Sequence, residues 1–449
     1  MNDRFDGFNL APTQILAMGF ALVILVGSML LNLPISSQDG RSIGFIDALF
    51  TSASAVCVTG LVVVDTGTHW TVFGKTIILI LIQIGGLGFM SLATMFAVLL
   101  GKKISLKERL VIQESLSQNT LSGVVRFTQY ILLGTLIIEG LGALFLSFTF
   151  IPEYGLVKGI AYSIFHSISA FCNAGFDIIG HGKGLTPYVN DPIVNFTVTS
   201  LIIIGGIGFS VVVDVINRRG LRRLSLHSKL VLVVTFVLLT SGFFAFLLLE
   251  WNNPETLGNL PLTGKLMAGF FQSTTTRTAG FNTIALDQMN DASKLLTMIL
   301  MFIGGSPAST AGGIKTATLG VIIFTVISVI RGKEETELFR KRISRDIVNR
   351  AITVSFISLT LVMFVTAILT ITETGFSFLD ILFESTSAFG TVGLSLGITS
   401  QLSPLGRLVI TFLMFAGRVG PITIVFALAR SQRKYKGIIK YPEGKILVG

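Results

Sequence analysis

Four short segments, spread evenly along the chain, decide the fold. Each begins with Phe-x-Ser and ends at a glycine, and the third is one residue shorter than the others. The glycines lie 115, 105 and 113 residues apart in a chain of 449. Self-similarity at a nearly fixed period indicates four copies of one structural unit. The segments read Phe50-Thr-Ser-Ala-Ser-Ala-Val-Cys-Val-Thr-Gly60, Phe165-His-Ser-Ile-Ser-Ala-Phe-Cys-Asn-Ala-Gly175, Phe271-Gln-Ser-Thr-Thr-Thr-Arg-Thr-Ala-Gly280 and Phe383-Glu-Ser-Thr-Ser-Ala-Phe-Gly-Thr-Val-Gly393.

Each segment lies between two longer apolar runs. A helical run of about 18 or more apolar residues can cross the hydrocarbon core of a bilayer, whereas the short segments are too short and are expected to be re-entrant. The order of span, short segment and span, repeated four times, predicts an all-α polytopic membrane protein. The predicted spans are Thr13–Leu33, Val72–Leu100, Phe127–Phe150, Val194–Ile216, Leu230–Leu249, Leu295–Ile330, Ala351–Ile371 and Leu405–Ala429.

The composition excludes a soluble globular protein. Hydrophobic residues make up 51% of the chain and charged residues 13%, whereas soluble domains carry about 25% charged residues. The net charge of +10 would suggest nucleic-acid binding. However, Lys and Arg concentrate at 101–126, 217–229, 331–350 and 430–449, between the apolar runs, as in the cytoplasmic loops of membrane proteins. The positive charge therefore marks the cytoplasmic loops and does not indicate a nucleic-acid partner. A basic surface that docks an acidic or nucleotide-binding cytoplasmic partner stays open.

The four repeats are expected to share one orientation, because each returns to a basic stretch. Both termini are then cytoplasmic in a multi-pass protein of the cell membrane, and Thr13–Leu33 is expected to be a retained span without a signal peptide. Four parallel repeats, each a first helix (M1), a pore loop and a second helix (M2), can enclose a central pore with pseudo-four-fold symmetry. The predicted units are repeat A at 13–100, repeat B at 126–216, repeat C at 228–330 with a broken M2 helix, repeat D at 348–429 and a cytoplasmic tail at 430–449.

The ends of the short segments are candidates for a selectivity filter. Non-helical backbone at membrane depth is tolerated where it is buried or lines a water-filled cavity. Glycine permits the backbone conformations that turn successive carbonyls towards an axis, and rings of carbonyls can replace the hydration shell of a cation. The alternative is a glycine that merely ends a short helix. The candidate filter residues are Val58, Thr59, Gly60, Asn173, Ala174, Gly175, Thr278, Ala279, Gly280, Thr391, Val392 and Gly393.

The second span of repeat C is too long for one crossing and is interrupted. Its glycine pairs and proline suit a regular helix poorly, which predicts two half-helices joined by a flexible loop at membrane depth. Such a loop could obstruct the pore beneath the filter; the alternative is a passive kink. The candidate gate residues here are Gly304, Gly305, Ser306, Pro307, Gly312, Gly313 and Lys315.

Arg418 lies in the middle of the last span and is a further gate candidate. A charged residue at that depth costs on the order of 2.5–3.5 kcal/mol on insertion scales and marks a functional site by default. If it faces the conduction path, it repels cations and limits flux. The alternative is an arginine satisfied by carbonyls at a helix end.

Several other residues are left with two interpretations. Gly85, Gly86, Gly205 and Gly206 in the second spans favour close helix packing. Asp65 and Asp177 could concentrate cations outside the filter or simply be solvated loop acids. Arg277 could brace the filter from behind, and the partner of Glu139 in the first span of repeat B cannot be read from the sequence.

Catalytic signatures are absent from the sequence. The four histidines form no metal-spaced pair, so an intramembrane enzyme is disfavoured. An alternating-access transporter of another solute remains the alternative function. It would need polar groups at the midplane, and the spans offer few besides Glu139, Asp214 and Arg418.

The four segment glycines, the glycine-rich stretch of repeat C and Arg418 resemble the Trk/Ktr/HKT cation transporters. The resemblance covers Thr13 to Ala429 and looks most like the membrane subunit of a bacterial Ktr potassium uptake system. It implies a K⁺ pore, with Gly60 at the filter position where glycine is associated with K⁺ and serine with Na⁺. It places the gate at 304–315 and Arg418 below the filter.

The resemblance also implies partners and leaves the ion coupling open. The expected assembly is a homodimer in the lipid bilayer, resting on a cytoplasmic ring of RCK-type regulatory subunits that bind ATP/ADP or NAD. No cofactor is expected in this chain. K⁺ is the transported ion, Na⁺ is a second candidate, and channel-like uptake and Na⁺-coupled symport stay open.

Overall fold

A computed structural model of the chain describes residues 12–88, 90, 106–115, 123–218 and 220–420. Several predicted features therefore lie outside the described residues. These are 91–100 of repeat A, 421–429 of repeat D, the tail 430–449 and most of the basic stretch 101–126.

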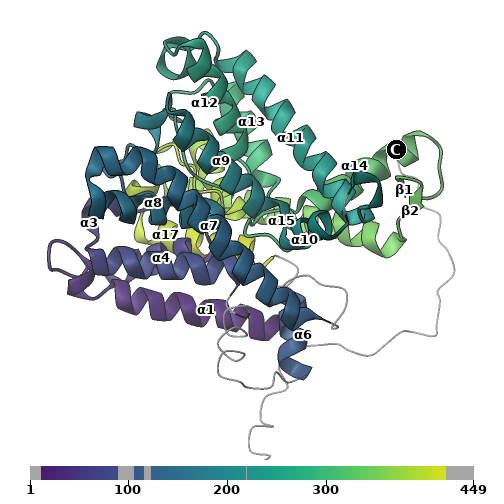
Figure 1. Ribbon diagram of the computed structural model, residues 1–449, viewed down its shortest axis with the longest axis horizontal. Coiled ribbons are helices and arrows are strands. Elements are labelled where there is room, and N and C mark those ends of the chain that lie inside the picture. Colours follow the sequence, from purple (N-terminus) through teal and green to yellow (C-terminus); the bar gives the residue numbers. More distant parts are fainter. Residues whose placement is uncertain (1–11, 89, 91–105, 116–122, 219, 421–449) are drawn as a thin grey trace, which may run out of the picture.

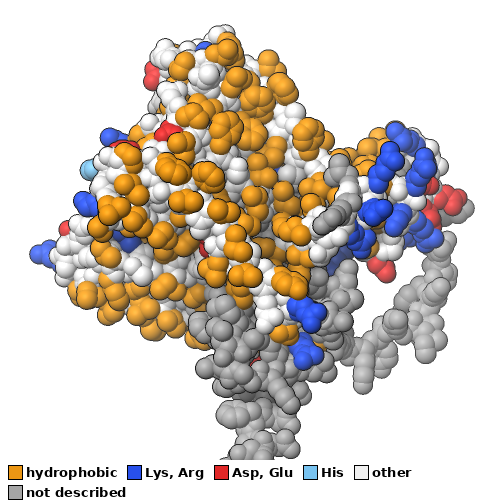
Figure 2. Space-filling view, in the orientation of Figure 1, with side chains coloured by type: hydrophobic (Ala, Val, Ile, Leu, Met, Phe, Trp, Pro, Cys, Tyr) orange, Lys and Arg blue, Asp and Glu red, His pale blue; other side chains and the backbone are white. Residues whose placement is uncertain are grey.

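Each repeat begins with a long apolar helix. In the described part of the chain, four continuous helices are long and apolar enough to cross a membrane. Apolar side chains on their outer faces are exposed, such as Leu22 at 62% and Leu136 at 63%, and hydrophobic side chains cover much of the surface in Figure 2. Such a surface suits lipid and not water. The predicted all-α polytopic membrane fold is confirmed, and its first helices are α1 (Pro12–Leu31), α7 (Val124–Tyr154), α11 (Leu226–Glu250) and α15 (Arg345–Thr372).

A shorter pore helix follows each first helix. The phenylalanine of every Phe-x-Ser is at most 3% exposed. The serine hydroxyl of this motif donates to a carbonyl of the first helix in three repeats: Ser52 to Ile24 at 2.7 Å, Ser167 to Glu139 at 2.6 Å and Ser273 to Leu239 at 2.8 Å. The motif therefore docks the pore helix onto the first helix in repeats A, B and C. The pore helices are α2 (Phe45–Val56), α8 (Leu156–Phe171), α12 (Leu262–Thr275) and α16 (Phe378–Gly390).

The second helices of repeats A, B and D end or bend at a glycine inside the continuous spans that hydropathy predicts, and that of repeat C is divided into two helices. The run Val194–Ile216 is bent by 92° at Gly208. Gly88, Gly208 and Gly420 hold equivalent places and have φ values of 78°, 98° and 92°, which glycine adopts without a steric penalty. Hydropathy reports apolarity and not backbone direction, so it misses the bend at Gly208. The elements are α4 (Val72–Leu87), α9 (Pro192–Ile207) with α10 (Phe209–Asn217), α13 (Asp291–Phe302) with α14 (Thr316–Ile330), and α17 (Pro404–Val419).

The repeats close into a ring. The second helix of each repeat packs on the pore helix of the next: α4 on α8, α9 on α12, α13 on α16, and α17 back on α2. Arg407 and Asp47 form an ion pair of 2.5 Å across the last of these contacts. Figure 1 shows the first and last repeats side by side, with α17 above α4. The four repeats thus surround one axis, as the pseudo-four-fold arrangement requires.

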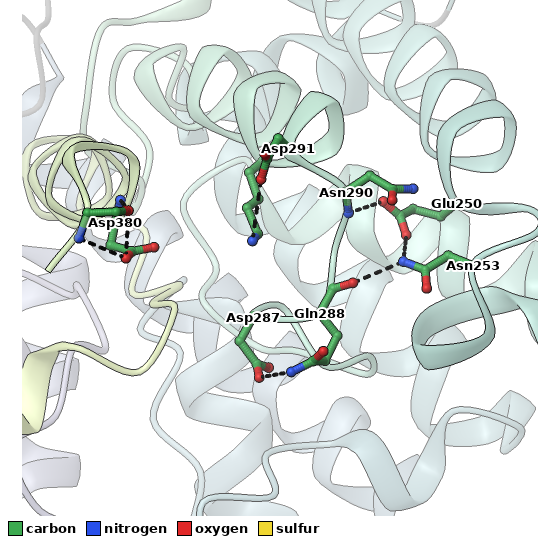
Figure 3. Close-up of polar contacts among 9 residues, drawn as sticks. Glu250, Asn253, Asp287, Gln288, Asn290, Asp291 and Asp380 are labelled. Atoms are coloured by element: carbon green, nitrogen blue, oxygen red, sulfur yellow. Dashed lines mark hydrogen bonds and ion pairs between the residues drawn. The ribbon is translucent and has the colours of Figure 1, made fainter.

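In repeats C and D, buried acids join the C-terminal end of the first helix to the start of the second helix. In repeat C, Glu250 is fully buried and accepts hydrogen bonds from Asn253 Nδ2 at 2.7 Å and the main-chain nitrogen of Asn290 at 3.0 Å (Figure 3). In repeat D, Glu373 accepts from both the main-chain nitrogen and the hydroxyl of Ser403. These bonds satisfy main-chain N–H groups at the starts of the second helices, which have no partner within the helix. They also tie the two helices of a repeat to each other.

A basic hairpin marks the opposite side of the molecule. Strands β1 (Glu337–Leu338) and β2 (Lys341–Arg342) pair antiparallel after α14. Figure 2 shows Lys and Arg gathered over this hairpin. The remaining elements are α3 (Thr66–His69), α6 (Leu106–Ser115) and the short turns η1 (Pro34–Ser36), η2 (Thr186–Tyr188), η3 (Leu221–Arg223), η4 (Pro254–Gly258) and η5 (Thr399–Gln401).

Candidate ion-conduction site

The glycines at the ends of the four segments meet in one ring. A Cβ atom placed on Gly60 would lie 3.1 Å from Cα of Gly175, and one on Gly175 would lie 2.9 Å from Cα of Gly280. The same test gives 3.4 Å from Gly280 to Gly393 and 2.9 Å from Gly393 to Gly60. The contacts return to their starting point, so the four loops enclose one axis. Any side chain at these positions would collide with the backbone of the next repeat.

The filter loops share one backbone conformation. Val58, Asn173, Thr278 and Thr391 have left-handed φ values of 58°, 59°, 67° and 50°. The glycine two residues later also has positive φ, between 68° and 90°. Such values are uncommon in residues other than glycine, and four in equivalent places indicate backbone held by its surroundings.

This conformation decides against the simple helix-end interpretation of the glycines. A left-handed residue follows within three positions of the end of each pore helix and lies two positions before the glycine. The glycine therefore serves the loop itself. Repeated left-handed residues break the alternation of an extended chain and let neighbouring carbonyls face one side, as a cation-binding ring requires.

A hydroxyl group from each pore helix braces its filter loop. Ser54 and Ser387 accept hydrogen bonds of 3.1 Å from the main-chain nitrogens of Gly60 and Gly393. In the other two repeats, Ser169 donates to the carbonyl of Phe176 at 2.7 Å and Thr275 to that of Phe281 at 2.6 Å. This role was not predicted from the sequence. The signal was present, since a hydroxyl residue recurs five or six positions before every segment glycine.

An open vestibule of about 630 Å³ lies directly outside the glycine ring. All four segment glycines line it, together with Asp65, Asp177 and Asp287. Burial and the neighbouring charge of Asp65 raise the pKa of Asp177 to about 6. Asp65 also accepts hydrogen bonds from the main-chain nitrogens of Gly67 at 2.8 Å and Gly182 at 3.0 Å. Asp65 therefore both holds the loop structure and lines the vestibule. Asp287 is a vestibule acid that was not predicted from the sequence.

The break between α13 and α14 is a loop closed at its base. The main-chain nitrogen of Gly304 donates to Ile314 at 2.8 Å, and that of Thr316 donates to Gly305 at 3.0 Å. The hydroxyls of Ser306 and Thr316 lie 2.9 Å apart. The glycine pairs make this base tight, because a Cβ on Gly313 would lie 3.3 Å from Cα of Gly304.

The tip of this loop contacts two opposite repeats next to their filter loops. Thr310 Oγ1 donates to the carbonyl of Phe171 in repeat B at 3.2 Å. A Cβ on Gly312 would lie 2.9 Å from Cγ2 of Thr391 in repeat D. Repeats B and D are the two neighbours of repeat C in the ring, so the loop is held between them. Lys315 donates to Ala311 at 2.7 Å, and the carbonyl of Pro307 faces Gly208.

Arg418 connects this loop to repeat A. Its guanidinium donates to the carbonyls of Thr310 in the loop and of Gly85 and Gly86 at the end of α4. It is thus satisfied by helix-end carbonyls, and it also lines a cavity of about 220 Å³ with Lys315 and Arg350. A cation that reaches this cavity meets three basic side chains.

The second-span glycines pack against the ends of the pore helices. A Cβ on Gly86 would lie 2.6 Å from Sγ of Cys172, and one on Gly205 would lie 3.0 Å from Oδ1 of Asn173. Arg277 is 6% exposed beside the repeat C filter, and its Nε and Nη2 have no hydrogen-bond partner among the described residues. Glu139 accepts a bond from Gln83, a partner 56 residues away in the sequence.

Comparison with known proteins identifies the family. The family model described as "TrkH: Cation transport protein" matches residues 11–437. The chain belongs to the TrkH family of cation transport proteins. The TrkH family consists of ion transporters and not of enzymes, which agrees with the missing catalytic signatures.

Relatives within the TrkH family align over nearly their whole length. The chain is 48% identical to "Ktr system potassium uptake protein B" of Bacillus subtilis, covering 98% of this chain and 97% of that protein. It is 44% identical to "Potassium/sodium uptake protein NtpJ" of Enterococcus hirae, covering 98% of both. The crystal structure of the potassium transporter TrkH from Vibrio parahaemolyticus has the same fold, with a TM-score of 0.73 at 16% identity over 96% of this chain and 87% of that one.

Proposed function

We propose that this chain takes up K⁺ through the ring of four glycine-centred loops. The observation that carries the proposal is the ring itself, in which four repeats place the same backbone conformation around one axis. Carbonyls held in this way can replace the water around a cation as it sheds its hydration shell. The names of the relatives, which include potassium and potassium/sodium uptake, support K⁺ as the main ion and Na⁺ as a second or coupled ion.

The membrane potential supplies the driving force, and the vestibule brings cations to the ring. Acids around the outer opening raise the local cation concentration. Movement of one charge through a potential of 100 mV is worth about 2.3 kcal/mol. Uptake into the cell therefore needs no hydrolysis of ATP by this chain.

The 304–315 loop and Arg418 act as the gate. The loop crosses between repeats B and D, and Arg418 holds its tip through Thr310 while adding positive charge to the inner cavity. Release of either contact would clear the path below the ring. The gate is closed in this arrangement, and a cytoplasmic subunit opens it.

The assembly is a homodimer in the bacterial plasma membrane, with both termini in the cytoplasm. Its partner is a cytoplasmic ring of nucleotide-binding subunits of the RCK type, regulated by ATP/ADP or NAD. Two supports are the Ktr system named for the relatives and the basic side chains over the β1–β2 hairpin. This surface has the charge needed to dock an acidic partner.

The test is uptake of radioactive Rb⁺ into liposomes that contain the protein with its cognate partner, at an inside-negative potential set by an ionophore. We expect Rb⁺ uptake that K⁺ inhibits strongly and Na⁺ weakly. Gly60→Ser should reduce the preference for K⁺ over Na⁺. Uptake with equal inhibition by K⁺ and Na⁺, or a Gly60→Ser variant with unchanged preference, would contradict the filter assignment.

A further inference from the structure

Two polar side chains lie in the apolar wall behind the filter of repeat B. Glu139 is in the middle of α7 and is 5% exposed. Its Oε2 accepts a hydrogen bond of 3.1 Å from Nε2 of Gln83 on α4, so the pair joins repeats A and B. An ionisable residue inside a membrane span is costly and marks a functional site by default. The function proposed above uses neither side chain.

The pair touches the residue that directly precedes the filter turn. Sγ of Cys172 lies 3.6 Å from Oε1 of Gln83 and 3.8 Å from Oε1 of Glu139. Cys172 is followed by Asn173, the left-handed residue that starts the filter loop. The main-chain carbonyl of Glu139 also accepts the bond from Ser167 on the same pore helix. Glu139 therefore contacts the pore helix near its middle and at its end.

The other repeats build the same wall from apolar residues. The residues whose carbonyls accept the Phe-x-Ser hydroxyl in repeats A and C are Ile24 and Leu239. Counted from the glycines of the second helices, the positions of Gln83 in repeats B and D are Ile203 and Phe415. Apolar side chains are therefore enough to pack this region in other repeats. Close packing alone does not explain why repeat B has the Glu139–Gln83 pair.

We propose that Glu139, held by Gln83, is a positioning residue for the filter loop of repeat B and sets how strictly the pore prefers K⁺ over Na⁺. The inference rests on the K⁺ conduction proposed above. Apolar contacts allow the end of a pore helix to slide and rotate, whereas a hydrogen bond between the buried Glu139 and the half-buried Gln83 has a fixed direction. The pair thereby fixes Cys172 and, through the chain, the filter carbonyls of repeat B that a cation must fit.

The experiment measures Rb⁺ uptake and its inhibition by Na⁺ in liposomes for three variants. Glu139→Leu introduces the residue of repeat C, and Gln83→Leu removes the same bond from the other helix. We expect both to keep Rb⁺ uptake within about twofold while the preference over Na⁺ falls roughly fivefold, because one oriented hydrogen bond is lost. Glu139→Gln keeps the shape and a hydrogen-bonding group, so it should keep the parent's preference.

A matched control lies one turn away on α7. Thr135 is buried, and its hydroxyl has no partner among the described residues, so Thr135→Val should leave the preference unchanged. The double variant of Glu139 and Gln83 should lose no more of the K⁺ over Na⁺ preference than either single variant, because each single variant already removes the same hydrogen bond. Thermal unfolding in detergent checks that each variant folds. If Glu139→Leu does not fold, the ion preference of Gln83→Leu decides the question.

Three results would overturn the inference. A folded Glu139→Leu or Gln83→Leu variant with the parent's ion preference would show that the pair does not position the filter. A Glu139→Gln variant as poor as Glu139→Leu would assign the effect to charge. A parent protein without Rb⁺ uptake would overturn the proposed function as well, which separates that failure from the first two.

Discussion

Single hydroxyl groups hold the filter backbone, and Ser54 offers the clearest test. Its Oγ accepts the hydrogen bond from the main-chain nitrogen of Gly60 at 3.1 Å. Ser54→Ala should lower the K⁺ over Na⁺ preference several-fold, because a buried donor at the ring loses its partner at a cost of about 1–3 kcal/mol. Inhibition of Rb⁺ uptake by Na⁺ measures this.

Ser385 on the pore helix of repeat D provides the control for Ser54. Its hydroxyl has no hydrogen-bond partner among the described residues. Ser385→Ala removes the same atom from a pore helix without breaking a described bond, so the ion preference should not change. Equal losses in the two variants would mean that Ser54 does not act through Gly60.

Asp177 makes uptake depend on the external pH. Its pKa is raised to about 6, so the carboxyl is charged above pH 6 and neutral below it. A unit charge roughly 8 Å from a passing cation is worth about 0.5 kcal/mol in water, which is about a twofold change in binding. Acidification from about pH 7.5 to 5 should therefore raise the KM for Rb⁺ about twofold, with the midpoint near pH 6.

The Asp177→Asn variant supplies the control for this titration. It lacks the charge at every pH, so its KM should already be raised at about pH 7.5 and should change little on acidification. A variant that keeps the parent's pH dependence would show that Asp177 is not the source of that dependence.

At the scale of elements, the proposed gate can be tested at the fit of the 304–315 loop against repeat D. A Cβ on Gly312 would lie 2.9 Å from Cγ2 and 3.0 Å from Cβ of Thr391. Gly312→Ala should push the loop away from this contact and raise Rb⁺ uptake several-fold in the absence of the cytoplasmic partner. Initial uptake rates in liposomes measure the change.

Gly134 on α7 is the matched glycine for this experiment. A Cβ there meets no atom within 4 Å, so Gly134→Ala should leave the rate unchanged. A slower Gly312→Ala variant would mean that the loop supports the open path and does not obstruct it.

Local patterns predict some elements of this fold and not others. The pore helices and the meeting of their glycines follow from a motif that is repeated four times. The bend at Gly208 could not be predicted from hydropathy, because the residues on both sides of it are equally apolar. The partners of Glu139 and Arg418 lie 56 and more than 100 residues away, so no local pattern contains them. The hydrogen bonds of Glu250 and Glu373 are likewise tertiary contacts, and no local sequence motif marks the residues that form them.

At the scale of the whole molecule, the orientation in the membrane can be tested by labelling. Both native cysteines, Cys57 and Cys172, are fully buried, so a membrane-impermeant maleimide should not label the parent protein. In intact cells, Asn252→Cys at the outer end of α11 should be labelled and Glu335→Cys beside the β1–β2 hairpin should not. In inverted vesicles the two results should be exchanged. The opposite pattern would reverse the proposed topology.

The seam between the last and first repeats has a consequence for biosynthesis. The ion pair of Arg407 with Asp47 joins residues 360 positions apart, and α17 packs on α2 at the same seam. While the ribosome is still making repeat D, repeats A, B and C form an open ring, because α2 has no α17 to pack on. The conduction path therefore forms only when the last second helix is inserted. A truncated chain should leave the cell with misfolded protein and not with an unregulated leak of ions.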